Sequence, residues 1–202
     1  MQLDHFLSLL ENTEGSLPLR ALVALMKELE VDRETLGEAV RFDPEHYRRN
    51  LLHVGPYHAA LVLCWAPGQK SPIHDHVGSA CGVRVVEGTV TERRLTLDSG
   101  GGLREAGTSS LGKGGVCGSF DGDIHEVRND AEDEALITLH VYTPPLSVYH
   151  LFDEETGRRT EKEDAETGQA LRARGKAMST AREASGRISH SPRHVGHRGG
   201  PP

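Results

Sequence analysis

Two segments rich in glycine and histidine, about fifty residues apart, place the strongest limit on how this chain can fold. Both contain histidines framed by glycines, in the order Gly68, His74, His76 and Gly88, then Gly114, His125 and Asn129. Side chains of an extended strand alternate between its two faces, so histidines separated by one residue should point to the same side of a sheet. Glycine permits the tight turns that join short strands. The pattern therefore predicts short strands joined by tight turns, with His74 and His76 on one face of a sheet.

This order of residues resembles the two-part motif of the cupin superfamily. The chain departs from the motif at two positions: Phe120 replaces a proline that shapes a turn, and Cys81 replaces the glutamate that is usually the fourth metal ligand. The resemblance implies a mainly β fold, a jelly-roll-like cupin β-barrel. Short apolar runs at residues 60–65, 83–86 and 135–141 favour the same architecture, with residues 99–102 at a hairpin tip.

The three histidines of the motif are candidate metal ligands. Neutral imidazole is the commonest protein ligand for first-row transition metals, and His74, His76 and His125 would supply three of them. Three neutral ligands leave the charge of a divalent ion uncompensated and leave coordination positions open. Such a site suits a substrate that brings its own anionic donor, such as a thiolate. The spacing alone does not identify the metal, because three histidines also hold catalytic zinc.

Several further segments resemble the type I cysteine dioxygenases, which are thiol dioxygenases of the cupin superfamily. The resemblance spans residues 43–157 and rests on segments 47–51, 63–65, 73–76, 79–81, 125–129, 139–145 and 150–157. It implies an enzyme that uses dioxygen to convert L-cysteine to cysteine sulfinic acid. It also implies Fe(II) as the cofactor, held by His74, His76 and His125, with cysteine bound to the iron through its thiolate and amine.

The resemblance also assigns residues to the substrate. Arg49 falls where the family has the arginine that binds the substrate carboxylate, and Tyr47 falls where a tyrosine supports that end of the pocket. A guanidinium suits this role because its fork of N–H groups matches a carboxylate with two parallel hydrogen bonds. If the segment is extended, the two side chains share one face. Considered by itself, Arg49 would be interpreted as an ordinary solvated arginine.

A segment near residue 140 is expected to line the site. Thr138, His140 and Tyr142 follow a period of two and should share one face of a strand. The resemblance implies that Thr138 and His140 orient the phenol of Tyr142 toward substrate and oxygen, with His140 not a metal ligand. It also implies a thioether crosslink, at least partial, between Cys81 and Tyr142, and this crosslink would tune the catalytic rate. Considered alone, Cys81 would be interpreted as a small buried apolar residue. The family has a cis peptide at the position of Thr143–Pro144, and we expect one here.

The composition of the 202 residues limits the function further. A formal net charge of −7 argues against nucleic-acid binding, which requires clustered positive charge. The cysteines are odd in number and lack framework spacing, so we expect no disulfide scaffold, and Cys64 and Cys117 should be buried thiols. The N-terminus lacks a signal-peptide pattern, and no segment has the roughly twenty apolar residues that span a bilayer. We expect a monomer in the reducing cytoplasm, without nucleic-acid or membrane partners.

Composition and periodicity divide the chain into three parts. Residues 1–42 have apolar residues at helical spacing and should form helices outside the barrel, which occupies residues 43–160. Residues 161–202 contain eight Lys or Arg and five Asp or Glu but few large apolar residues. We expect this tail to be disordered, with a transient helix over 165–184. Metal binding by the tail is the alternative offered by His190, His194 and His197.

Three other functions remain open at this level. A related thiol dioxygenase would act on another small thiol such as 3-mercaptopropionate, although such enzymes usually have glutamine at the position of Arg49. A second alternative is a cupin isomerase or hydrolase that contains zinc, nickel or manganese. The third is a ligand-binding cupin that acts as a sensor without catalysis. Arg49 and Cys81 together favour cysteine as the substrate.

Overall fold

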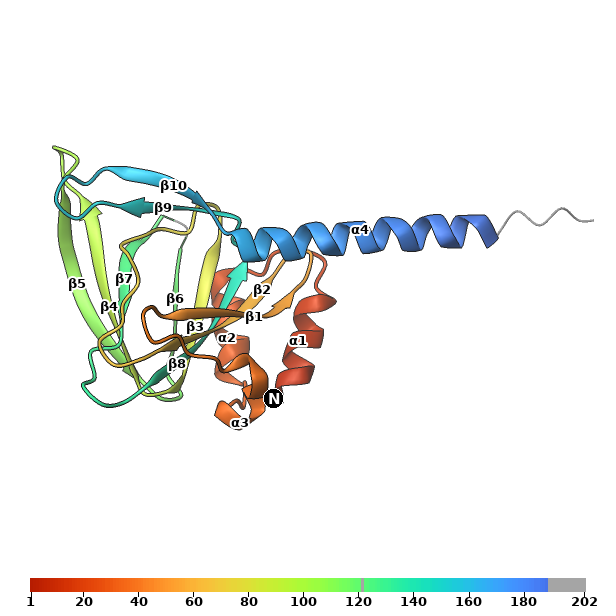
Figure 1. Ribbon diagram of the computed structural model, residues 1–202, viewed down its shortest axis with the longest axis horizontal. Helices are drawn as coiled ribbons and strands as arrows, with labels where there is room; N and C mark the ends of the chain where they lie inside the picture. The colour runs from red at the N-terminus through yellow and green to blue at the C-terminus, as the bar shows by residue number, and fades with distance from the viewer. Residues whose placement is uncertain (121, 189–202) are drawn as a thin grey trace, which may run out of the picture.

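The computed structural model describes residues 1–120 and 122–188, which form a β-structure with helices at both ends of the chain (Figure 1). In chain order the elements are α1 (Leu3–Glu11), α2 (Leu19–Lys27), α3 (Arg33–Leu36), the 3-10 helix η1 (Gly37–Ala39), β1 (Arg48–Val54), β2 (Ala59–Trp65), β3 (Ala80–Glu87), β4 (Thr89–Leu97), β5 (Leu103–Gly112), β6 (Val116–Ser119), β7 (Ile124–Arg128), β8 (Leu136–Thr143), β9 (Val148–Phe152), β10 (Arg159–Glu163) and α4 (Ala165–Ile188). The predicted mainly β fold is confirmed. Within the described residues, no helix is long and apolar enough to cross a membrane.

The strands form two larger sheets and a hairpin. Five strands are ordered β1-β2-β8-β3-β6, three are ordered β5-β4-β7, and β9 pairs with β10. Figure 1 shows β4, β5 and β7 on the side of the barrel away from the N-terminal helices, with β9 and β10 across the top. The segment between β2 and β3 connects these groups, because His74 forms backbone bridges with His125 of β7 and with Leu151 of β9.

Strands β2 and β8 are buried along their whole length. Alternate side chains of β2 enter two different cores: Ala60 and Val62 pack with the N-terminal helices, whereas Leu61 and Trp65 pack inside the barrel. Strand β8 divides in the same way, with Leu139 in the outer core. This two-sided burial explains why both strands appear in the sequence as continuous apolar runs rather than as alternating patterns.

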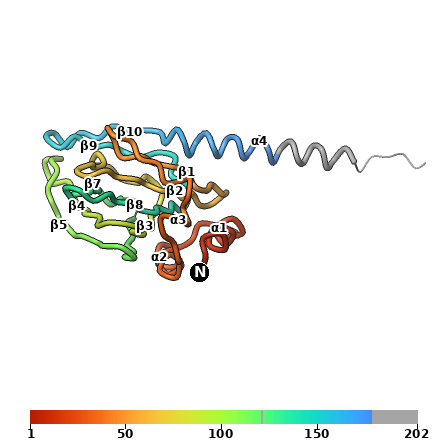
Figure 2. Tube along the Cα trace, turned by 60° about the horizontal axis from the view of Figure 1, so that its bottom comes forward, coloured from red at the N-terminus to blue at the C-terminus, as the bar shows by residue number. Residues whose placement is uncertain are grey.

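The N-terminal helices cover the outer face of the five-stranded sheet, as predicted. Phe6 and Leu10 of α1 and Leu22 and Met26 of α2 are buried in the outer core with residues of β2 and β8. Helix α2 lies against β3 and β6, and Figure 2 shows α1 and α2 on one side of the strands. Gly82 of β3 permits this close approach, because a Cβ atom there would lie 2.6 Å from Met26 Sδ.

Two glycines of the motif occupy positions that require glycine. Gly68 and Gly88 have φ angles of +75° and +78°, in the left-handed region that side chains disfavour. At Gly88 an added Cβ would also lie 2.6 Å from the carbonyl oxygen of Ala135. Gly88 therefore allows the chain to reverse direction between β3 and β4 while it passes close to the start of β8.

The C-terminal segment differs from the predicted disordered tail. Strand β10 pairs with β9 through residue 163, and α4 then extends away from the barrel (Figure 1). Asp164 caps the helix by accepting a hydrogen bond of 2.9 Å from the backbone N–H of Thr167, and Arg174 forms an ion pair with Glu11 of α1. We expected disorder with a transient helix over 165–184, and the structure describes the end of β10 and α4 over residues 161–188, with these polar contacts at the start and middle of the helix. The three tail histidines, His190, His194 and His197, lie outside the described residues.

Two local predictions concern the prolines and cysteines. The Thr143–Pro144 peptide bond is cis, which confirms the prediction. All three cysteines are free thiols; Cys64 is buried, as expected, whereas Cys117 is only partly buried.

Candidate metal centre

Three histidines from two separate segments converge inside the barrel. His74 and His76 come from the segment between β2 and β3, and His125 comes from β7. One nitrogen of each ring lies within 4.8 Å of the other two, and the Nε2 atoms of His76 and His125 are 3.3 Å apart. The prediction that His74 and His76 share a strand is wrong, because both lie outside the named strands and only His74 forms backbone bridges. Those bridges hold the segment between β7 and β9, so both rings still reach the same site.

Hydrogen bonds at the outer nitrogens orient the rings. His74 Nδ1 lies 2.9 Å from the carbonyl oxygen of Pro72, which can only accept, so this nitrogen carries the proton. His125 Nδ1 lies 2.7 Å from Oε1 of Glu92 on β4 and donates to it in the same way. These contacts leave the Nε2 lone pairs of both rings free for a metal ion. A carboxylate or carbonyl behind the ring is typical of histidines that bind metals.

Burial keeps the site nitrogens available for a metal. It holds the pKa of His74 and of His76 well below the usual 6.5, so both rings are neutral at physiological pH. The hydrogen bond from His125 lowers the pKa of Glu92, which is therefore an anion at neutral pH. Three converging imidazoles fit a divalent transition-metal ion, because such ions bind the lone pair of an imidazole nitrogen. Among the described residues, no carboxylate or thiol joins the three histidines as a further ligand.

Arg49 of β1 reaches the same interior. Its guanidinium carbon lies 5.9 Å from the centre of the Tyr142 ring, and its positive charge contributes to the lowered pKa of His74. The ring of Tyr47 stacks on that of Trp65, with centroids 4.3 Å apart and an interplanar angle of 10°. Burial raises the pKa of Tyr47, and the charge of Arg49 opposes that rise. The structure thus places Tyr47 near Arg49, and the charge of Arg49 reaches His74.

Arg49 has an acidic partner that the sequence did not indicate. Its Nη2 forms an ion pair with Oδ2 of Asp164, at the junction of β10 and α4. The Arg49 side chain is 22% exposed and that of Asp164 is 5% exposed. Burial acts to lower the pKa of Arg49, but the acidic groups of Tyr142 and Asp164, when ionised, outweigh it, so the pKa is raised and Arg49 remains a cation. The candidate carboxylate anchor is therefore already paired with a carboxylate.

Cys81 and Tyr142 face each other across neighbouring strands. They are directly opposite in the antiparallel ladder of β3 and β8, and both are buried. Side chains at such positions are within contact distance. Burial raises the pKa of both side chains, so both keep their protons at neutral pH. The fold thus juxtaposes the thiol and phenol for which a crosslink is predicted.

Thr138 and His140 form the expected hydrogen-bonded pair. The pair contacts Trp65 and Cys81 rather than the predicted Tyr142. The hydroxyl of Thr138 lies 3.0 Å from His140 Nε2 and accepts a hydrogen bond of 3.0 Å from Trp65 Nε1. His140 Nδ1 lies 3.7 Å from Cys81 Sγ. No hydrogen bond joins His140 to Tyr142 within the described chain, and their ring centroids are 6.3 Å apart. The predicted direct link to the phenol is therefore absent, because the imidazole faces the thiol on the neighbouring strand.

Comparison with known proteins identifies the family. The family model for cysteine dioxygenase type I matches residues 14–155. The chain belongs to the type I cysteine dioxygenase family. Cysteine dioxygenase type 1 from Homo sapiens is 30% identical over 140 residues, which are 67% of this chain and 70% of the relative. The protein of the same name from Danio rerio is 31% identical over 140 residues, which are 66% of this chain and 69% of the relative.

Solved structures resemble this chain more weakly than the curated relatives do. A conserved protein with a double-stranded β-helix domain from Klebsiella pneumoniae is 17% identical, with a TM-score of 0.48, and the match covers 60% of this chain and 97% of that chain. Membership of the cysteine dioxygenase family confirms the resemblance on which the prediction of a cupin barrel rested. The family match begins earlier than the predicted resemblance, at residue 14, and ends before β10 and Asp164.

Sequence reasoning missed several polar residues that support this site. Glu92 orients His125 from a strand that carried no recognised motif. Asp75 accepts hydrogen bonds from the ring Nδ1 and the backbone N–H of His150, both of 2.8 Å, and so attaches β9 to the ligand segment. The position of Asp75 between two candidate ligands is a signal that could have been used. Glu92 and Asp164 have no such signal, because nothing in their spacing relates them to the residues that they contact.

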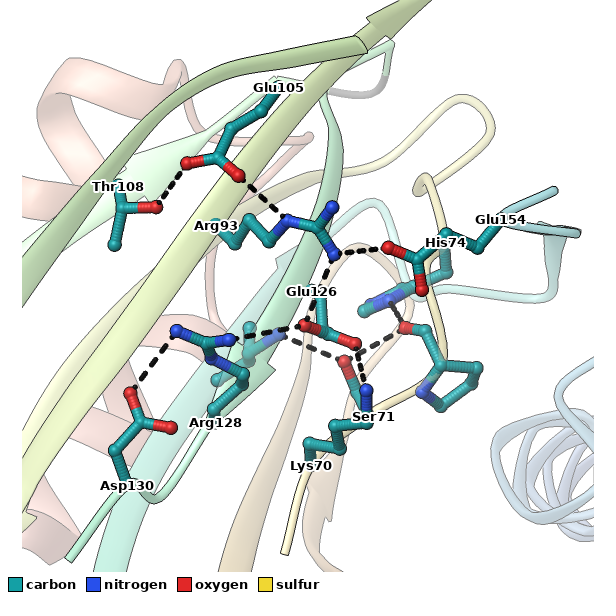
Figure 3. A network of polar contacts seen from close by, with 12 residues as sticks. Lys70, Ser71, His74, Arg93, Glu105, Thr108, Glu126, Arg128, Asp130 and Glu154 are labelled. Carbon is teal, nitrogen blue, oxygen red and sulfur yellow. Dashed lines mark hydrogen bonds and ion pairs between the residues drawn. The ribbon is translucent and has the colours of Figure 1, made fainter. Parts of the chain in front are cut away.

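A buried carboxylate beside His125 ties the ligand segments together (Figure 3). The side chain of Glu126 is 2% exposed, and Lys70 Nζ lies 2.8 Å from its Oε1. Arg93 of β4 and Arg128 of β7 each approach its Oε2 at 3.8 Å. Figure 3 shows these cations converging on Glu126 near His74. The network joins β4, β7 and the start of the ligand segment, and thereby supports the relative positions of the histidines.

We predict that His125→Ala abolishes stable metal binding, because two imidazoles in place of three cannot hold the ion against buffer exchange. After loading with Fe(II) under anaerobic conditions and desalting, the bound metal per chain should fall at least about tenfold. Elemental analysis measures this, and circular dichroism checks that the fold is retained. His46→Ala, which removes an exposed histidine, is the matched control and should retain the metal. Full occupancy in His125→Ala would contradict the ligand assignment.

Proposed function

We propose that this protein is an iron-dependent dioxygenase that converts L-cysteine to cysteine sulfinic acid. The observation that carries the proposal is the convergence of three histidines near a partly buried arginine, in a chain of the type I cysteine dioxygenase family. In this reaction the thiol sulfur takes up both atoms of one dioxygen molecule. The S–H hydrogen becomes the acidic proton of the sulfinic acid, so no additional reductant is consumed.

The proposed metal is Fe(II), held by His74, His76 and His125. When bound, a ferrous ion supplies a redox-active centre that can interact with both a thiolate and dioxygen. The donor set supports this proposal, since three neutral ligands leave positions for substrate atoms and leave the charge of the ion to be balanced by a thiolate. Glu92 would keep His125 in the tautomer that presents Nε2 to the metal.

Arg49 is proposed to bind the substrate carboxylate, with Tyr47 supporting that end of the pocket. The guanidinium is a partly buried cation on the same side of the site as Tyr142. The raised pKa of Tyr142 keeps its phenol protonated at neutral pH, so it can donate a hydrogen bond to the substrate. Thr138 and His140 would hold the thiol of Cys81 in place, and through it Tyr142. We further propose that Cys81 and Tyr142 form the thioether crosslink.

Other functions are disfavoured by specific features. A dioxygenase of 3-mercaptopropionate would use the same metal ligands, and Arg49 is the feature that favours cysteine. An isomerase or hydrolase that uses zinc, nickel or manganese, or a sensor, would have no use for Cys81 opposite Tyr142. A monomeric state and a cytoplasmic location remain predictions from the sequence.

Oxygen uptake by the Fe(II)-loaded protein tests the proposed function. We expect uptake with L-cysteine, with one sulfinate formed per dioxygen consumed, as measured by an oxygen electrode and mass spectrometry of the product. Parallel reactions contain 3-mercaptopropionate, and protein loaded with Zn(II) serves as the control. A preference for 3-mercaptopropionate would change the substrate but not the reaction. Absence of uptake with either thiol would reject the proposal.

Arg49→Gln should mainly weaken the binding of L-cysteine. A charge-assisted hydrogen bond contributes roughly 1.5–3 kcal/mol, so we expect the KM to rise by about tenfold or more. Steady-state kinetics measure the change. Thermal unfolding must accompany them, because the substitution also leaves Asp164 without its cation. The neighbouring exposed Arg48→Gln is the control, and an unchanged KM in Arg49→Gln would exclude the proposed role.

Cys81→Ser should prevent the crosslink while retaining part of the activity. A thioether between β3 and β8 makes the denatured chain more compact, so the wild-type protein should give two bands on a denaturing gel. The variant should give one band, because serine cannot form the thioether. Cys117→Ser, which alters a partly buried thiol of β6, should retain both bands. Two bands in Cys81→Ser would show that another pair of residues is linked.

A further inference from the structure

We propose that Asp164 is a specificity-determining residue that competes with the substrate carboxylate for Arg49. This inference rests on the proposed function, in which Arg49 binds the carboxylate of the thiol substrate. Asp164 thereby weakens the binding of thiols that carry a carboxylate and leaves thiols without one unaffected. The family match ends at residue 155, so Asp164 belongs to a part of the chain that the match does not include.

The carboxylate of Asp164 is held on both of its oxygens. Oδ1 accepts a hydrogen bond of 2.9 Å from the backbone N–H of Thr167 and so caps α4. Oδ2 pairs with Nη2 of Arg49. The backbone N–H of Asp164 donates a hydrogen bond of 2.9 Å to the carbonyl oxygen of Ser147, just before β9. These three contacts therefore fix Asp164 at the edge of the site, whereas an ion pair between two solvated side chains would not be fixed.

Asp164 is the counter-ion of Arg49 at neutral pH. The other groups that act most strongly on the pKa of Arg49 are the phenols of Tyr142, Tyr47 and Tyr149, and phenols are uncharged at that pH. A substrate carboxylate would therefore meet a cation whose charge is already balanced. With the Asp164 side chain only 5% exposed, little solvent is present to screen the repulsion between the two carboxylates.

The repulsion distinguishes two classes of thiol. L-cysteine must either share Arg49 with Asp164 or displace it, and displacement also removes the cap of α4. An aminothiol without a carboxylate, such as 2-aminoethanethiol, can supply the same sulfur and nitrogen without approaching Arg49. Asp164 thus reduces the preference in binding for L-cysteine over 2-aminoethanethiol that Arg49 would otherwise produce.

Asp164→Asn isolates the charge, because asparagine has the same shape and is an equally good helix cap. In the Fe(II)-loaded full-length protein, we expect the KM for L-cysteine to fall by about tenfold, the loss expected when one charged partner no longer competes. The KM for 2-aminoethanethiol and the kcat for L-cysteine should each change by less than about twofold. Titration calorimetry under anaerobic conditions should show the same fall in the Kd for L-cysteine.

Controls separate charge from structure. Glu163→Gln removes an exposed acid of β10 next to Asp164 and should leave both KM values unchanged. Asp164→Ala removes both charge and cap; a lower KM for L-cysteine in Asp164→Ala but not in Asp164→Asn would overturn the proposal, because loosening of α4 would then be the cause. In an Arg49→Gln background, where no guanidinium is left to compete for, Asp164→Asn should lower the KM by less than it does with Arg49 present.

Other outcomes also overturn the inference. A higher KM for L-cysteine in Asp164→Asn would mean that Asp164 positions Arg49 for the substrate. An equal fall for both thiols would mean that the substitution widens access to the site. If the wild-type protein oxidises no thiol, the proposed function fails, whereas anaerobic calorimetry still reports whether Asp164 weakens the binding of L-cysteine.

Discussion

The burial of β8 on both faces is the constraint on which the rest of the structure depends. Its outward side chains, such as Leu139 and Val141, complete the core under the N-terminal helices, and its inward side chains form one wall of the candidate site. Because β8 pairs with β2 on one side and β3 on the other, Trp65 lies against Thr138, and Cys81 lies opposite Tyr142. A polar side chain in the middle of a barrel is costly unless it has a partner. The contacts that run from Trp65 through Thr138 and His140 to Cys81 give these four side chains their partners.

The candidate ligands are positioned by backbone pairing rather than by a regular strand. His74 exchanges backbone hydrogen bonds of 2.9 Å with His125 in both directions, so the two segments of the motif are joined at the site itself. Asp75 attaches β9 on the other side, and Glu126 with its cations supports the start of the segment. This explains how a stretch outside the named strands can hold two imidazoles within reach of a third. His125 is oriented by Glu92 of the neighbouring strand β4, whereas His74 is oriented by the carbonyl of Pro72 in its own segment.

The sequence allowed prediction of those features that have a local signal. The order of glycines and histidines indicated the barrel, and the period of two from Thr138 to Tyr142 indicated an inward face; the structure brings these residues together. The strand assignment of His74 and His76 failed because alternation alone cannot tell a strand from an extended segment held by isolated bridges. Glu92, Asp75 and Asp164 could not be inferred from spacing, because their partners lie far away in the sequence. Only the fold specifies these pairs.

The composition of the segment after residue 160 did not indicate the role of Asp164. The segment has few apolar residues, so we expected little packing after residue 160. The buried carboxylate of Asp164 nevertheless makes two separate contacts there. Through Oδ1 it caps α4, and through Oδ2 it neutralises Arg49, so the helix is anchored where β1 faces the candidate metal site. A single polar anchor of this kind needs no apolar stripe, because an ion pair largely shielded from solvent is costly to break by removing either partner. Because solvent screens this ion pair only weakly, the negative charge of Asp164 also opposes any anionic group that approaches Arg49. In this protein the ion pair of Arg49 and Asp164 therefore both attaches α4 to the barrel and balances the positive charge in the pocket.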